Sequence, residues 1–134
     1  MRGSTNALPR TVGHPCGVAR RVLIVDDHAE FRRSARELLE AEGFETVGEA
    51  GDGASAVAEA KRLDPEVVLL DVHLPDVDGF TVAGQLSALP NSPVVVLTSA
   101  RELAAFAARL GPAAARGFIP KDQLCGQVLA ELLR

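Results

Sequence analysis

The sequence predicts a doubly wound α/β domain built on a parallel sheet, and three observations support this class. Short runs of valine, leucine and isoleucine recur along the chain, and segments with helical spacing separate them. Such continuous apolar runs are typical of parallel strands that helices cover on both faces, because neither face meets water. The length of 134 residues is that of one compact domain with a single core.

Three of the predicted strands are continuous apolar runs at residues 22–25, 67–70 and 94–97. Weaker strands are expected near residues 45–49 and 117–119. Valine and isoleucine favour strands because their branched side chains pack well on a pleated surface. Each strand is followed by a segment of helical character, so the order along the chain reads βαβαβαβαβα.

Helices are predicted in the intervening segments, at residues 31–39, 54–62, 79–88, 103–110 and 124–132. The first, fourth and fifth carry apolar residues three or four positions apart, which places those residues on one face of a helix. Gly43 follows the first stripe and Gly111-Pro112 follows the fourth. Glycine and proline in these positions commonly end helices.

The first 20 residues have no hydrophobic period and mix glycine, proline, serine, threonine and arginine, so they are interpreted as a flexible tail before a domain spanning 21–134. The net charge is −4. Because the first 21 residues hold four arginines and no acid, the rest of the chain is more acidic than this value suggests. An acidic body argues against nonspecific nucleic-acid binding and suits a site that holds a cation.

Cys16 and Cys125 lie far apart and lack the paired spacing of metal or redox motifs, so both are interpreted as free thiols in a reducing cytosol. No apolar stretch approaches the roughly 20 residues that span a bilayer, and the N-terminus lacks the apolar segment of a secretion signal. The expected protein is therefore soluble and cytoplasmic, without a membrane partner.

Polar residues follow four of the five predicted strands. In open parallel sheets the ligand crevice lies at the carboxyl ends of the strands, so residues distant in sequence are expected to meet there. The candidates are Asp26, Asp27, Asp71, Thr98, Ser99 and Lys121.

The residue types in this set fit phosphoryl chemistry with a divalent cation. Three neighbouring carboxylates repel one another unless a cation is present. Mg²⁺ binds oxygen ligands and suits one or two carboxylates together with a phosphate. A lysine and a hydroxyl can contact phosphoryl oxygens, and an aspartate can itself be the nucleophile that forms an aspartyl-phosphate.

The ordered set resembles the receiver domain of two-component response regulators over about residues 21–133. The matching residues are Asp26-Asp27, Asp71 with Pro75 and Gly79 downstream, Thr98, and Phe118 three positions before Lys121. The stretches DDH, EAGDG and LLDVHLPDVDG are similar to those of NarL/FixJ-type transcriptional regulators. The resemblance implies a flavodoxin-like (βα)5 fold with a five-stranded parallel sheet in the order 2-1-3-4-5.

The resemblance also implies roles for individual residues. Asp71 would accept a phosphoryl group from a histidine kinase, and Thr98 and Lys121 would hold its oxygens. Phe118 would be an aromatic switch coupled to Thr98. Mg²⁺ would be held by Asp26, Asp27, Asp71 and the backbone carbonyl of His73, with Asp26 acting at least through water.

The implied function is signalling, with catalysis limited to the domain's own phosphorylation and dephosphorylation. Homodimerisation on phosphorylation is a further expectation from the resemblance, and DNA would be contacted only through an effector domain absent from this chain. The 13 residues after Lys121 complete one helix. The chain is thus interpreted as a stand-alone receiver or, with the NarL/FixJ similarity in favour, as the receiver part of a transcriptional regulator.

Two other functions are compatible with the fold. A degenerate receiver could act as a phosphorylation-independent interaction module, although the complete set of acidic, hydroxyl and lysine residues favours phosphorylation. An aspartyl-phosphate phosphohydrolase would be expected to carry a second aspartate where His73 stands.

Some polar residues near the motifs are interpreted as structural. His28 is expected to face solvent at a helix start, and the side chain of His73 to be a bystander, although its position influences the lifetime of the phosphoryl group in the family. Asp76 and Asp78 are assigned to the loop turn and the next helix start. Either Thr98 or Ser99 is expected to cap the helix at 101–110.

Overall fold

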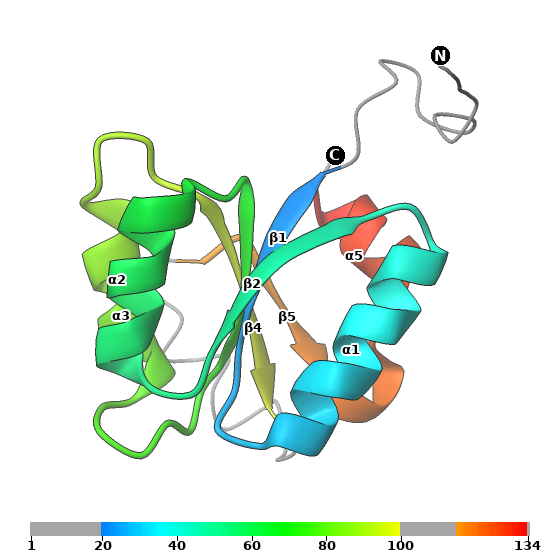
Figure 1. Cartoon of the computed structure of the whole chain (residues 1–134), viewed down its shortest axis with the longest axis horizontal. Helices are drawn as coiled ribbons and strands as arrows, with labels where there is room; N and C mark the ends of the chain where they lie inside the picture. Colours follow the sequence, from blue (N-terminus) through cyan, green and yellow to red (C-terminus); the bar gives the residue numbers. More distant parts are fainter. Residues whose placement is uncertain (1–19, 100–114, 134) are drawn as a thin grey trace.

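The computed structural model describes residues 20–99 and 115–133, which form a parallel five-stranded sheet with helices on both faces (Figure 1). The strands are β1 (Arg21–Val25), β2 (Glu45–Ala50), β3 (Val67–Asp71), β4 (Val94–Ser99) and β5 (Gly117–Pro120). Their spatial order is β2-β1-β3-β4-β5, which confirms the predicted doubly wound sheet. The winding direction switches between β1 and β3, where a ligand crevice is expected.

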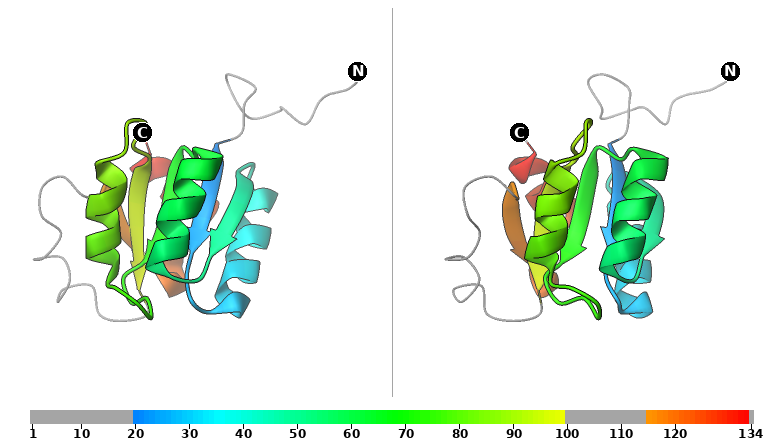
Figure 2. Two further views of the ribbon diagram at one scale, coloured as in Figure 1. Left: turned by 60° about the vertical axis from the view of Figure 1, so that its left-hand side comes forward. Right: turned by 90° about the vertical axis from the view of Figure 1, so that its left-hand side faces the viewer.

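Helices cover both faces of the sheet, with α1 and α5 on one side and α2 and α3 on the other (Figures 1 and 2). Their bounds are α1 (Ala29–Ala41), α2 (Gly53–Leu63), α3 (Gly79–Ser87) and α5 (Gly126–Leu132), with a short 3₁₀ helix η2 (Lys121–Gln123). The helix predicted at 103–110 and the predicted N-terminal tail up to residue 19 lie outside the described residues. None of the helices in the described ranges is long and apolar enough to cross a membrane.

The continuous apolar runs are explained by burial on both faces of the sheet. All five residues of β3 are buried. Side chains alternate along the strand, so Val68 and Leu70 pack toward α2 and α3, whereas Val67 and Leu69 pack toward α1 and α5. Full burial of such a side chain contributes about 1.5–3 kcal/mol, and the strand that ends at Asp71 is therefore firmly placed in the core.

Helix α1 ends as the sequence predicts, at a glycine. Gly43 adopts a φ of 98°, which glycine reaches without steric cost. The N–H of Phe44 donates to the carbonyl of Leu39 at 3.0 Å, and the N–H of Gly43 donates to that of Glu40 at 3.2 Å. This pair of bonds is the Schellman motif, and it turns the chain from α1 into β2.

The start of the last helix differs from the prediction. The apolar stripe included Leu124, but α5 begins only at Gly126, and Leu124 is extended with φ −67° and ψ 125°. Leu124 is nevertheless buried, packed in the cluster beneath α1 and α5. The stripe correctly indicated burial, whereas the 3₁₀ helix η2 intervenes before the regular helix starts.

The loop between β3 and α3 turns tightly directly after Asp71. The carboxylate of Asp78 accepts a hydrogen bond from the N–H of Thr81 at 2.8 Å and so caps α3, which agrees with its predicted role. The N–H of Gly79 donates to the carbonyl of Val72 at 2.7 Å. A Cβ on Gly79 would overlap the backbone of Asp71 and Val72, so only glycine fits at this close approach.

We expect Gly79→Ala to lower the free energy of unfolding by about 1–3 kcal/mol, because the methyl group would force the loop away from β3. Gly84→Ala in the same helix is the matched control, since a Cβ there meets no atom within 4 Å. It should raise the stability by about 0.5–1 kcal/mol through the better helix propensity of alanine. Urea unfolding followed by circular dichroism measures the stability of both variants. Equal changes in the free energy of unfolding would show that the loop accommodates the added methyl group without a free-energy cost.

Candidate functional site

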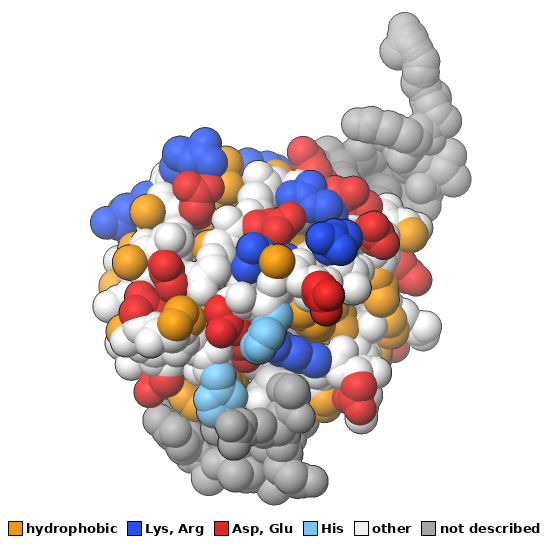
Figure 3. Space-filling view, turned by 60° about the horizontal axis from the view of Figure 1, so that its bottom comes forward, with side chains coloured by type: hydrophobic (Ala, Val, Ile, Leu, Met, Phe, Trp, Pro, Cys, Tyr) orange, Lys and Arg blue, Asp and Glu red, His pale blue; other side chains and the backbone are white. Residues whose placement is uncertain are grey.

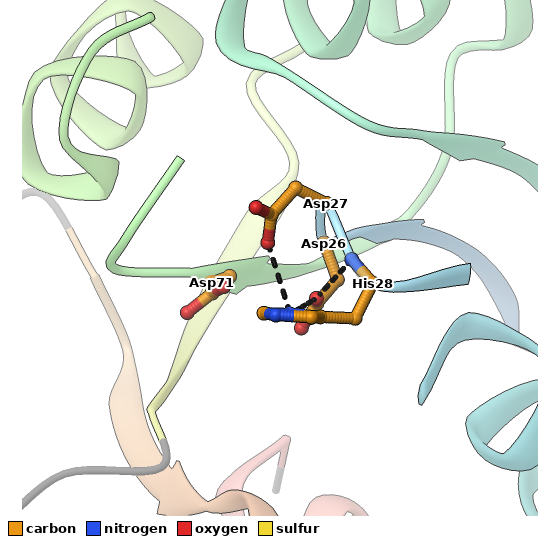
Figure 4. A group of neighbouring side chains, drawn as sticks. All are labelled: Asp26, Asp27, His28 and Asp71. Carbon is orange, nitrogen blue, oxygen red and sulfur yellow. Dashed lines mark hydrogen bonds and ion pairs between the residues drawn. The ribbon is translucent and has the colours of Figure 1, made fainter. Parts of the chain in front are cut away.

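Acidic side chains gather where β1 and β3 end, at the edge of the sheet drawn lowest in Figure 1. Figure 3 shows that acidic, basic and histidine side chains lie together on this end of the molecule. Asp26 and Asp27 follow β1, and Asp71 is the last residue of β3 (Figure 4). Oxygen or nitrogen atoms of these three aspartates and of His28 all lie within 4.8 Å of one another.

The three carboxylates differ in their exposure to solvent. Asp26 is 0% exposed and Asp71 is 2% exposed, whereas the side chain of Asp27 is 35% exposed. Burial raises the pKa of Asp71, and the negative charge of Asp26 adds to this effect. A hydrogen bond from the N–H of His73 and the charge of Lys121 act in the opposite direction on that pKa. Asp71 is therefore a buried carboxylate whose charge is only partly balanced.

Lys121 supplies the positive charge of the cluster. It begins η2 directly after β5, and its Nζ lies 2.6 Å from Oδ2 of Asp26 and 3.4 Å from Oδ2 of Asp71. The ammonium group also lies 4.7 Å from the centre of the Phe31 ring on α1, within the range of a cation–π contact. In this structure Lys121 is thus closer to Asp26 than to Asp71.

Thr98 lies directly beside Asp71, because the two residues are partners in the β3–β4 register. Thr98 as a whole is 1% exposed, and its hydroxyl has no hydrogen-bond partner among the described residues. Buried hydroxyls are normally paired, so this one is available to a ligand at the site. Ser99 is also buried. The helix that Thr98 or Ser99 was predicted to cap lies outside the described residues.

Phe118 lies on β5, where it is the register partner of Leu97 rather than of Thr98. The ring is half-buried and packs against the cluster under α2 and α3. Phe118 is therefore one position away from Thr98 on the neighbouring strand, close to the site but outside the group of carboxylates.

The two histidines lie at the site in different ways. The N–H of His73 donates to Oδ1 of Asp71 at 3.2 Å, while its side chain is exposed. His28 was predicted to face solvent and is 68% exposed, but its Nδ1 lies 3.1 Å from Oδ1 of Asp26 and 3.0 Å from Oδ1 of Asp27. The prediction missed these contacts, which arise because the helix start directs the ring back over the preceding aspartates (Figure 4). Its place directly after Asp26-Asp27 was the signal.

Asp76 has a contact that the sequence did not reveal. Its carboxylate accepts hydrogen bonds from the N–H groups of Gly53 at 2.8 Å and Ala54 at 3.0 Å. These bonds lower the pKa of Asp76, that from Gly53 most. Asp76 therefore ties the loop after β3 to the N-terminus of α2, in addition to its predicted place in the turn.

The arrangement of carboxylates could bind a metal ion. Oxygen atoms from three aspartates converge within 4.8 Å, and the ammonium of Lys121 contacts both Asp26 and Asp71. Oδ2 of Asp26 is fully buried and has no partner with hydrogen-bond geometry in the described part of the chain. A hard divalent cation that prefers oxygen ligands fits this donor set.

Comparisons with known proteins agree with this geometry. A family model described as the response regulator receiver domain matches residues 22–132. The nitrate/nitrite response regulator protein NarP of Escherichia coli is 37% identical over 115 residues, which are 85% of this chain and 53% of NarP. The transcriptional regulatory protein PdtaR of Mycobacterium tuberculosis is 37% identical over 123 residues, which are 85% of this chain and 60% of PdtaR.

Solved structures share the fold as well. The signal receiver domain assigned to the response regulator NarL of Mycobacterium tuberculosis superposes with a TM-score of 0.76 at 32% identity, and the match covers 86% of this chain and 97% of that domain. The chain spans little more than half the length of the curated relatives it matches.

We expect Asp71→Asn to raise the free energy of unfolding at neutral pH by about 1 kcal/mol, a usual size for a single substitution. Burial raises the pKa of Asp71 above the ordinary 3.8, so the folded state binds this proton more tightly than the unfolded chain does. The contribution of this proton to the stability is complete below pH 3.8 and is lost as the pH rises through the raised pKa. The gain from asparagine should therefore disappear in acid, which urea unfolding in EDTA at a series of pH values measures.

Asp76→Asn is the matched control with the opposite sign. Hydrogen bonds lower the pKa of Asp76, so its contribution to stability is present above the ordinary carboxyl pKa and is lost as the pH falls through the lowered value. This variant should be less stable than the wild type at neutral pH. An Asp71→Asn protein that is destabilised at neutral pH would contradict the interpretation that Asp71 is a buried carboxylate whose charge is only partly balanced.

Proposed function

The chain belongs to the response regulator receiver domain family, and from this we propose that Asp71 accepts a phosphoryl group from a histidine kinase. The observation that carries the proposal is the buried Asp71 carboxylate, with Asp26 and Lys121 beside it. In the adjacent register position lies the hydroxyl of Thr98, which has no hydrogen-bond partner among the described residues. An oxygen of Asp71 would form a bond to phosphorus while the N–P bond of the kinase's phosphohistidine breaks. The electron pair of that bond would return to the imidazole nitrogen.

Mg²⁺ is the proposed cofactor. Asp26, Asp27 and Asp71 would hold it together with the backbone carbonyl of His73, with Asp26 acting directly or through water. When bound, the ion would neutralise the carboxylates and reduce the repulsion between Asp71 and the incoming phosphoryl oxygens. The convergence of the three carboxylates within 4.8 Å supports this assignment.

Lys121 and Thr98 are proposed to hold the phosphoryl oxygens. The ammonium of Lys121 already lies 3.4 Å from Oδ2 of Asp71, and the buried Thr98 hydroxyl has a hydrogen bond to donate. Movement of these side chains toward the phosphoryl group would leave space beside β4 and β5. Phe118 is proposed to respond by changing its burial, because it lies one register position from Thr98.

The output of the domain is proposed to be a change in binding to another protein or domain. The relatives include response regulators and transcriptional regulators, so we assign this chain to a transcriptional regulator that contacts DNA through an effector domain outside residues 1–134. The domain would act in the cytoplasm, catalyse only its own phosphorylation and dephosphorylation, and form a homodimer when phosphorylated.

The acceptor is tested by incubation with acetyl phosphate and Mg²⁺, followed by intact-protein mass spectrometry. The wild type should gain a phosphoryl group that hydroxylamine removes, as expected for an acyl phosphate. Asp71→Asn should gain none, while Asp78→Asn, which keeps a good helix cap, should be labelled at the rate of the wild type. Labelling of Asp71→Asn at the full rate would refute the acceptor assignment. A folded wild type without label would instead favour a phosphorylation-independent module.

Lys121→Ala tests the proposed role of the lysine. Loss of the ammonium leaves the carboxylates without their counter-charge, so Mg²⁺ should bind at least as tightly as in the wild type, measured by calorimetry. Phosphorylation by acetyl phosphate at saturating Mg²⁺ should slow by about 100-fold, because a donor to the transferring group is lost. Lys61→Ala on α2 is the control of equal charge change. A rate equal to that of the control would mean that Lys121 does not contact the phosphoryl group.

A further inference from the structure

We propose that Arg32 on α1 is a positioning residue that sets the direction of the Asp27 carboxylate by holding the backbone carbonyl of Asp26. The inference rests on the proposed function, because it concerns how the aspartates present their oxygens to a divalent cation. Arg32 itself need not touch the cation or the phosphoryl group.

The Arg32 guanidinium joins the ends of two strands. Its Nη1 donates to the carbonyl oxygen of Asp26 at 2.5 Å, directly after β1. Its Nε donates to Oε1 of Glu49 on β2 at 3.0 Å. Oε2 of Glu49 accepts a hydrogen bond from Nε of Arg36 at 2.9 Å, one turn further along α1. The side chain of Arg32 is 21% exposed, so these contacts are partly shielded from water.

The carbonyl of Asp26 and the N–H of Asp27 belong to the same rigid peptide plane. A hydrogen bond to this carbonyl therefore fixes the rotation of the plane and, with it, the direction in which Asp27 leaves the backbone. The N–H of Asp26 is held separately by the carbonyl of Ala50 at 3.0 Å. Arg32 thus supplies the second of two anchors that flank Asp26.

Asp27 depends on this anchor more than the other aspartates do. Asp26 and Asp71 are fixed by burial, but the side chain of Asp27 is 35% exposed. Its described contact is with Nδ1 of the exposed His28 at 3.0 Å. A ligand that burial does not fix must be oriented through its backbone, and ligand geometry has to hold within about 0.5 Å for tight binding.

The chemistry of the side chain suits this task. A planar guanidinium can reach two acceptors in different directions, which the ammonium of a lysine does less well. The charge of Arg32 is paired with that of Glu49. Arg32 therefore holds the loop without forming an ion pair with Asp27, which would compete with a cation for that carboxylate. Loss of such supporting partners commonly weakens metal binding by about 10–100-fold.

The experiment compares Arg32→Gln with two matched variants of the same helix. Arg36→Gln removes the other hydrogen-bond donor to Glu49 but leaves the Asp26 carbonyl contact, and Arg33→Gln removes an equal charge at an exposed position. Mg²⁺ affinity is measured by calorimetry and by the rise of the thermal unfolding midpoint with Mg²⁺ concentration. We expect Arg32→Gln to bind Mg²⁺ about tenfold more weakly, with both controls within about twofold of the wild type.

Phosphorylation by acetyl phosphate separates positioning from general damage. In Arg32→Gln the Mg²⁺ concentration for half-maximal rate should rise about tenfold, while the rate at saturating Mg²⁺ stays near that of the wild type. Wild-type affinity in Arg32→Gln would overturn the inference. Equal weakening in Arg36→Gln would also overturn it, because the Glu49 ion pairs and not the carbonyl contact would then be responsible.

The result remains decisive if Arg32→Gln fails to fold. Arg32→Lys keeps the charge and the apolar stem but cannot serve both acceptors in the same geometry. It should bind Mg²⁺ roughly threefold more weakly than the wild type, and unchanged affinity would overturn the inference. A wild type that binds no Mg²⁺ would instead refute the proposed function itself, so the two failures are distinguishable.

Discussion

Two aspartates are buried side by side at the ends of β1 and β3, and the charge of Lys121 balances only part of their negative charge. The rest of the site depends on this charge imbalance. Asp26 is 0% exposed and Asp71 is 2% exposed. A buried carboxylate without a full complement of partners costs several kcal/mol. The raised pKa of Asp71 expresses that cost. A cation or a phosphoryl group that adds compensating contacts would relieve this cost.

The fold keeps the carboxylates together against their repulsion through its backbone. β3 is buried along its whole length, and its neighbours on both sides are strands rather than mobile segments. Gly79 then brings the exit loop against the backbone at Asp71 and Val72. Core packing contributes far more free energy than the repulsion between two charges costs. The aspartates therefore stay where the strands place them, and the pKa of Asp71 is raised while its position is kept.

The sequence predicted the elements whose signals are local and missed contacts that depend on the path of the chain. Continuous apolar runs identified the central strands because those strands are buried on both faces, and Gly43 marked the end of α1 through its backbone conformation. Leu124 was placed in the last helix because its spacing reports burial, which an extended residue can share. The bonds of Asp76 to α2 join residues 22 and 23 positions apart. No local pattern encodes which turn brings them together.

The loops that directly follow β1 and β3, next to the aspartates, are anchored to opposite layers of the fold. Arg32 on α1 holds the loop after β1, and Asp76 holds the loop after β3 to the N-terminus of α2. Since α1 and α2 lie on different faces of the sheet, the spacing of the loops is set by the sheet rather than by bonds between the carboxylates. If Asp71 is phosphorylated as proposed, the loops are therefore poorly placed to move in response. Thr98 and Lys121 belong to neither loop. Under this proposal, movement of their side chains transmits the change toward β5.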